Sequence, residues 1–221
     1  MRIKVAISLS LFAIFGAPVP LLNAATISFQ GNLSTDATFL PPGAPAFTDA
    51  DYAQWAAVVS SFHVSSTSTI QATTFSYGGG TNGNGVAILE GGFEPYLTLF
   101  DGSGHFIAST FYGTVCPAGA NANSISGYCF DVGLDAGTVG PGDYQIAISA
   151  FDNLSLAENY GTGTLSDGFT GLGNLAPGED LHYGFDVVLT PAVVTPEPRA
   201  LLPAGLLAMS LWLTKRKRGQ S

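Results

Sequence analysis

The sequence predicts an all-β protein: a single jelly-roll-like β-sandwich of about eight strands, flanked by an N-terminal signal helix and a C-terminal hydrophobic sorting helix. Short apolar or alternating runs recur along the chain between turn signals, which is the pattern of a sandwich. The body is rich in Gly, Thr, Ser, Phe and Tyr, and no convincing amphipathic helix is found in it. Its length is about that of one domain, so we expect one core spanning residues 25–190.

The clearest turn signals are the Gly- and Pro-rich stretches at 40–43, 78–83, 101–104 and 140–143. A helical turn is the alternative for 51–59, because Ala and Gln favour it. Residues 159–178 read as a long loop and a candidate lid over one sandwich edge, and 191–195 read as a linker. The predicted strands are 26–33, 57–64, 69–77, 96–100, 106–112, 127–133, 143–151 and 181–189.

The strand at 96–100 is predicted to be central. Tyr96, Thr98 and Phe100 face one way, whereas Leu97 and Leu99 face the other. Both faces are fairly apolar, as in a strand covered on both sides.

Charge is divided sharply along the chain. Residues 25–195 contain fifteen of the sixteen acidic residues and no Lys or Arg. Nucleic acid binding is excluded, because nothing in the body can neutralise phosphates. The carboxylates must be solvated, hydrogen-bonded or bound to cations. All seven basic residues lie in the two terminal segments: Arg2, Lys4, Arg199, Lys215, Arg216, Lys217 and Arg218.

The N-terminal segment has the three parts of a secretory signal peptide. Arg2 and Lys4 form a positive region, residues 5–16 are apolar, and residues 22–24 offer small-residue cleavage before Ala25. We therefore expect residues 1–24 to be a signal peptide and the body to be exported.

The C-terminal segment combines a helix breaker, an apolar run at 200–214 and a basic end. In this order it resembles the PEP-CTERM sorting signal of exported bacterial proteins, here spanning residues 196–218. The resemblance implies a Gram-negative host that makes exopolysaccharide, a transient anchor in the inner membrane and processing by a protease of the exosortase type. The alternative is an ordinary tail anchor. The residues that carry the resemblance are Pro196, Glu197, Pro198, Lys215, Arg216, Lys217 and Arg218.

Residues 91–104 are the most patterned part of the body. They resemble the strand and turn of pre-peptidase C-terminal-type domains, as do the run at 140–144 and residues 167–169. The resemblance implies a β-sandwich body. Glu94 stands where that family usually has Asp.

Cys116 and Cys129 are the only cysteines. An even, minimal count in an exported chain favours one disulfide, which would close a loop of Gly, Ala, Asn and Ser. A metal-binding or redox pair is the alternative, although the spacing is too long for a CxxC motif.

Calcium is the sharpest ligand hypothesis, because it takes oxygen ligands from compact loops. The alternative is that these aspartates bond their own turn backbone, as Asp before Gly commonly does. The candidate ligands are Asp101 with Ser103, Asp49 with Asp51, and Asp152 with Asn153.

Catalysis has little support in the sequence. His63, His105 and His182 are widely separated, and the chain contains neither an HExxH nor a GxSxG motif. We expect a non-enzymatic structural or adhesive protein of the cell envelope or extracellular matrix, linked to exopolysaccharide. The alternatives are a calcium-dependent polysaccharide-binding module and an enzyme acting on the same polymer.

Overall fold

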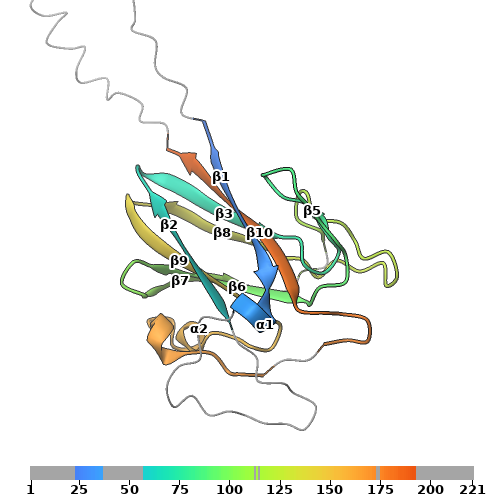
Figure 1. The fold of residues 1–221 in the computed structure, drawn as a ribbon. Helices are drawn as coiled ribbons and strands as arrows, with labels where there is room; N and C mark the ends of the chain where they lie inside the picture. The colour runs from blue at the N-terminus through green and yellow to red at the C-terminus, as the bar shows by residue number, and fades with distance from the viewer. Residues whose placement is uncertain (1–22, 37–56, 112, 114, 173–174, 193–221) are drawn as a thin grey trace, which may run out of the picture.

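The computed structural model describes residues 23–36, 57–111, 113, 115–172 and 175–192 (Figure 1). The chain over these ranges is mostly β. Both terminal signals, Asp49, Asp51 and most of the predicted helical turn lie outside the described residues. None of the helices in these ranges is long and apolar enough to cross a membrane.

One sheet contains four antiparallel strands in the order β1-β10-β3-β8. Ala25 pairs with Leu189, and Ser68 pairs with Pro191. The described chain therefore begins and ends at the same end of this sheet (Figure 1). The strands are β1 (Ala25–Asn32), β10 (His182–Pro191), β3 (Ser68–Thr74) and β8 (Gly133–Val139).

The other sheet is antiparallel as well, in the order β2-β9-β6-β7. Six of the seven residues of β6 are buried, and β6 lies between β9 and β7, so the prediction of a central strand is confirmed. The strands are β2 (Val58–Val64), β9 (Gly142–Ala150), β6 (Pro95–Asp101) and β7 (Phe106–Thr110).

The pairings of the eight longer described strands are nested. The first pairs with the last (β1 with β10), and the second with the second-last (β2 with β9). The third then pairs with the sixth (β3 with β8), and the fourth with the fifth (β6 with β7). Two short strands, β4 (Gly80–Thr81) and β5 (Ala87–Ile88), form a separate hairpin.

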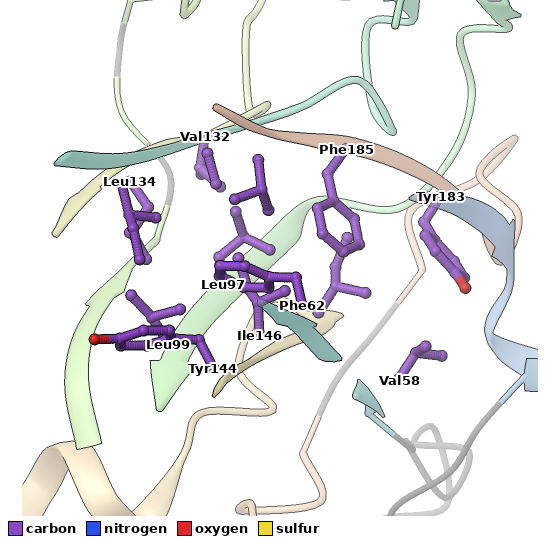
Figure 2. Close-up of a cluster of buried hydrophobic side chains, with 14 of the residues drawn as sticks. Val58, Phe62, Leu97, Leu99, Val132, Leu134, Tyr144, Ile146, Tyr183 and Phe185 are labelled. Carbon is purple, nitrogen blue, oxygen red and sulfur yellow. The ribbon is translucent and has the colours of Figure 1, made fainter. Parts of the chain in front are cut away.

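Side chains from both sheets meet in one apolar core. Figure 2 shows that the labelled side chains lie between the ribbons of the two sheets. Full burial of each large aliphatic or aromatic side chain contributes about 1.5–3 kcal/mol, so this cluster is the main source of stability. Its largest fully buried members include Ile70, Phe93, Leu97, Leu99, Ile146, Ile148 and Phe185.

A smaller cluster covers the opposite face of β6. Tyr96 and Phe100 pack there with Ala157 and Phe169, whereas Leu97 and Leu99 belong to the main core. The covering segment carries α2 (Leu156–Tyr160) and the 3-10 helix η1 (Leu165–Asp167). The prediction of a long loop at 159–178 is therefore wrong at 159–160, where α2 ends, and at 165–167, where η1 lies.

A hydrogen bond from a buried tyrosine of β6 links α2 to the sheet. The hydroxyl of Tyr96 donates to the carboxylate of Glu158 (2.6 Å). Burial, and then this hydrogen bond, raise the pKa of Tyr96 above its ordinary value, so the hydroxyl stays protonated. The only other helical turn in the described residues is α1 (Leu33–Asp36), whose Leu33 enters the main core.

The prediction of a strand at 127–133 is wrong, because the strand in this region is β8, beginning at Gly133. Residues 127–131 instead bond to the turn after β3, through the carboxylate of Asp131. The glycines of β8 are typical of turns, so the sequence does not indicate a strand there. Gly137 has a φ of 67° and stands at a register shift, where most residues would be strained.

Candidate functional site

Two loop segments fold together beside the ends of the strands, and we call residues 76–92 and 115–131 the disulfide lobe. The first segment follows β3 and leads to β6, and the second leads to β8. Because β3 begins beside Pro191 and ends at the lobe, residues 115–131 lie about 20 Å along the sheet from Pro191, whereas the turn at Gly83 reaches back to Thr26 near the start of β1. Figure 1 shows it as the green and yellow-green loops around β5.

Three consecutive glycines let the two segments of the lobe approach each other. A Cβ at Gly78 would lie 1.8 Å from the carbonyl oxygen of Asn121, and one at Gly80 would lie 2.6 Å from that of Gly119. Gly79 has a φ of 69°, which favours glycine. The glycine run is therefore a packing requirement as well as a turn signal.

The side chain of Asp131 binds the backbone of this glycine turn. Its side chain is buried and accepts hydrogen bonds from the Thr74 hydroxyl (2.8 Å) and from the backbone N–H groups of Tyr77 (3.2 Å) and Gly78 (2.8 Å). Burial raises the pKa of Asp131 above its ordinary value, although these donors act in the opposite direction. These hydrogen-bond donors, rather than a Lys or Arg side chain, stabilise the carboxylate of Asp131.

Cys116 and Cys129 are joined by a disulfide in the structure, with their Cα atoms 5.2 Å apart. The bond closes the second segment of the lobe on itself. It adds a covalent constraint to the segment whose backbone packs against the glycine run at 78–80.

Aromatic rings form a series from the interior of the lobe to its surface. Buried Tyr77 packs against Phe130 with ring centroids 4.8 Å apart, and Tyr128 stacks on Phe130 at 5.6 Å with an interplanar angle of 18°. The Tyr77 hydroxyl is bonded to that of Ser126 (2.8 Å). Tyr128, which is 64% exposed, is thus held in a fixed orientation at the surface.

The loop carrying Tyr128 is stiffened by its own hydrogen bonds. The side-chain oxygen of Asn123 accepts from the N–H groups of Ile125 and Ser126 (3.0 Å each). The Asn123 N–H donates to the carbonyl of Tyr128 (2.9 Å). Such side-chain caps favour a single loop conformation.

Two surface cavities lie on either side of residues 87–90. One, of about 570 Å³, is lined by Gly78–Thr81 backbone and by polar groups that include Asn121 and Ser124. The other, of about 450 Å³, is lined by Gln30, His182 and Tyr183 among others. Leu89 and Glu90 line both cavities.

Polar contacts fix the walls of both cavities. The carboxylate of Glu90 accepts from the hydroxyl (2.5 Å) and the N–H (2.8 Å) of Ser124, and these bonds hold the pKa of Glu90 below its ordinary value. His182 Nε2 donates to the carbonyl of Leu89 (2.9 Å), while its Nδ1 faces Asp180.

The candidate calcium ligand Asp101 lies in a tight turn whose backbone it caps. One carboxylate oxygen accepts from the N–H groups of Ser103 (2.8 Å) and His105 (2.9 Å), and the other lies 3.1 Å from Nδ1 of His105. Burial acts to raise the pKa of Asp101, but the bonds from His105 and Ser103 outweigh it and lower the pKa. This is the geometry of a turn aspartate.

Asp152 and Asn153 lie at the other end of the same sheet, because Ala150 pairs with Pro95 whereas Tyr144 pairs with Asp101. Asp152 has a φ of 73°, and its carbonyl accepts from the Thr170 hydroxyl (2.5 Å). The buried Asn153 side chain accepts from the N–H of Gly171 (2.8 Å). The structure therefore separates Asp101 and Ser103 from Asp152.

Among the described residues, no three His, Cys, Asp or Glu side chains lie together in a way that could hold a metal ion. Each histidine lies beside its own aspartate. Nδ1 of His63 lies 2.7 Å from Asp143, at the end of the second sheet where Asp101 and His105 also lie. His182 lies beside the lobe.

Glu94 is a site residue that sequence reasoning missed. It lies where the chain leaves the lobe for β6. Burial, then the negative charges of Glu179 and Asp152, raise the pKa of Glu94 to about 7. With no Lys or Arg in the body, this repulsion has no basic side chain to relieve it. No local sequence pattern signals it, because the three carboxyls come from separate segments.

Comparisons of the chain with protein-family models, with curated proteins and with solved structures found no match. The disulfide lobe combines an exposed, fixed aromatic ring with cavities whose walls contain peptide groups, an amide, hydroxyls, Glu90 and His182, which is an arrangement suited to binding a ligand.

Proposed function

We propose that the protein is an exported, non-enzymatic component of the cell envelope or extracellular matrix, sorted by its C-terminal signal and serving a structural or adhesive role with exopolysaccharide. The segregation of charge carries this proposal. Every Lys and Arg lies in the two terminal segments. The body between them has fifteen acidic residues and no Lys or Arg. This division fits terminal segments that direct the protein to a membrane and a body that stays soluble outside it.

The body is proposed to be a jelly-roll β-sandwich. Two four-stranded sheets share one core, and the nested pairing of first with last and second with second-last strands is what results when one long hairpin folds over on itself. This architecture supports an adhesive module, because it places loops at the two ends of rigid sheets.

The position of the chain ends supports a defined orientation. Ala25 pairs with Leu189, so the segments that continue into both signals leave from one end of the first sheet. The disulfide-bonded segment 115–131 leads into β8 at the opposite end of β3, where Thr73 pairs with Gly133. While the tail holds the protein at the inner membrane, this segment of the lobe then faces away from that membrane.

Mass spectrometry of the C-terminus tests the sorting proposal. The full-length chain is expressed in a host that has a protease of the exosortase type, and in the same host with that protease deleted. We expect loss of everything beyond Pro196–Pro198 only when the protease is present, with the product in the envelope or medium. A variant with Glu197→Ala should stay uncut.

An intact tail in both strains, with the protein in the membrane fraction, would contradict sorting and leave a simple anchored surface domain. Calcium dependence is not part of the proposal, since the carboxylate of Asp101 is engaged by its own turn and Asp152 lies at the other end of the sheet.

A further inference from the structure

The disulfide lobe gathers most of the exposed apolar surface of the described residues. Of the six large apolar side chains that are most exposed there, five lie in the lobe: Val86, Leu89, Val115, Ile125 and Tyr128. Leu89 is 77% exposed and Ile125 is 92% exposed, in loops that are tied by hydrogen bonds and a disulfide. Rigid loops with unburied apolar side chains mark a binding surface.

Aromatic stacking and polar groups occur together on this surface. Tyr128 presents a ring backed by Phe130, and the same loop contributes Asn121 and Ser124 to the wall of the 570 Å³ cavity. Pyranose rings have apolar faces that stack on aromatic rings and hydroxyl edges that bond to amides and peptide groups. The lobe offers both kinds of contact.

Charge decides which polymer fits. The body has no Lys or Arg that could pair with a uronate, sulfate or phosphate, and Glu90 lies in the wall of both cavities. An acidic polymer would be repelled by a body with fifteen carboxyl groups. A neutral polymer meets no such penalty.

We infer that the disulfide lobe is a binding site for a neutral, hexopyranose-based polysaccharide, with Tyr128 as its stacking platform. This inference rests on the proposed matrix function and names the ligand class for it. The segment that carries Tyr128 leads into β8 at the end of the sheet away from Ala25 and Pro191, so a tethered protein presents it toward the matrix.

Affinity electrophoresis of the full-length chain tests the inference, with native gels that contain hydroxyethylcellulose, galactomannan or dextran, and alginate as the acidic counterpart. We expect retardation by at least one neutral polymer and none by alginate. Tyr128→Ala should weaken that binding roughly tenfold. Tyr128→Phe should retain it, because the ring remains. Phe111→Ala, which removes another exposed ring outside the lobe, should also retain it.

Three results would overturn the inference: no retardation by any of the neutral polymers, equal retardation of Tyr128→Ala, or retardation by alginate alone. Self-association that Tyr128→Ala abolishes, seen by sedimentation without polymer, would reassign the lobe to a second copy of the chain. None of these results alters the C-terminal mass spectrum, so failure of the binding site and failure of the sorting proposal are distinguishable. Circular dichroism of each variant shows whether the fold is intact.

Discussion

The two sheets and the disulfide lobe are held together by different means. In the sheets, alternate side chains of both layers enter one apolar core, and strand pairing satisfies the backbone. In the lobe, glycine backbones lie against each other, a buried carboxylate binds their N–H groups, and a disulfide closes the loop. The sheets can therefore bury nearly all their large apolar residues, whereas the lobe leaves several of its own at the surface. Stability and recognition are thus placed in separate regions.

The largest effect is expected in the sheet core. Ile146→Ala removes a side chain that is 0% exposed, and we expect it to lower the free energy of unfolding by about 3–4 kcal/mol. Ile125→Ala makes the same chemical change in the lobe at a side chain that is 92% exposed, and should cost no more than about 0.5 kcal/mol. Urea denaturation of both variants measures the contrast. Equal costs would contradict the assignment of stability to the sheets.

The disulfide should matter next. Cys116 and Cys129 are separated by 13 positions, and replacing both by Ser is expected to cost about 3 kcal/mol through the freedom regained by the unfolded loop. Amide hydrogen exchange should show lost protection in the lobe and near-unchanged protection in β6 and β9. Uniform loss across both sheets would mean that the lobe and the core unfold as one unit.

Asp131→Asn tests the carboxylate that replaces a core in the lobe. An amide oxygen can keep the bonds from Thr74 and Tyr77, but the NH₂ group then faces the N–H of Gly78, so we expect a loss of about 2 kcal/mol. Asp135→Asn is the matched control at an exposed carboxylate, because an amide oxygen can keep the bond from the Gly137 N–H and the 3.5 Å contact with Gln71 Nε2 lies at the surface. Thermal unfolding of the two variants should separate them, and a neutral Asp131→Asn would contradict the role assigned here.

The smallest effect is electrostatic and depends on pH. The folded-state pKa of Glu94 is raised from 4.5 to about 7, so the folded state binds the proton more tightly than the unfolded state. Its ionisation therefore lowers stability as pH rises from about 4.5 to about 7, and the cost stays constant above that range. After allowance for solvent screening of this half-exposed group, Glu94→Gln should stabilise the protein by about 1 kcal/mol at pH 8 and by little at pH 4.5.

Glu90→Gln serves as the control for that comparison, because the pKa of Glu90 is lowered rather than raised. It should not increase stability at pH 8. Melting temperatures of the three proteins across this pH range provide the measurement, and a Glu94→Gln variant with the wild-type pH profile would contradict the repulsion.

How much the sequence predicts differs between the same two regions. Alternation and apolar runs place β2, β6, β9 and β10 to within a few residues, because burial in a sheet follows the period of the strand. The residues near Gly133 do not show this strand periodicity. Gly137 looks like a turn but lies in a bulge, and Tyr128 looks like a strand residue but stacks at the surface.

The lobe was poorly predicted because its contacts are long-range and its residues are read locally as turns. Asp131 acts on N–H groups that lie 53 and 54 positions earlier. Glu94, just beyond the lobe, has its pKa raised by burial and by carboxyls from other segments. Neither relation leaves a periodic trace. The turn aspartate Asp101 shows the reverse case, where a local alternative to the metal hypothesis matches the observed geometry.

The division between a stabilising pair of sheets and a recognising lobe is tested most directly by hydrogen exchange of the full-length chain with and without hydroxyethylcellulose, or whichever neutral polymer retards it. The account predicts slower exchange confined to residues 76–92 and 115–131, with β6 and β9 already protected and unchanged. Slowing at the opposite end, around His63 and Asp101, or no slowing in the lobe at saturating polymer, would contradict it.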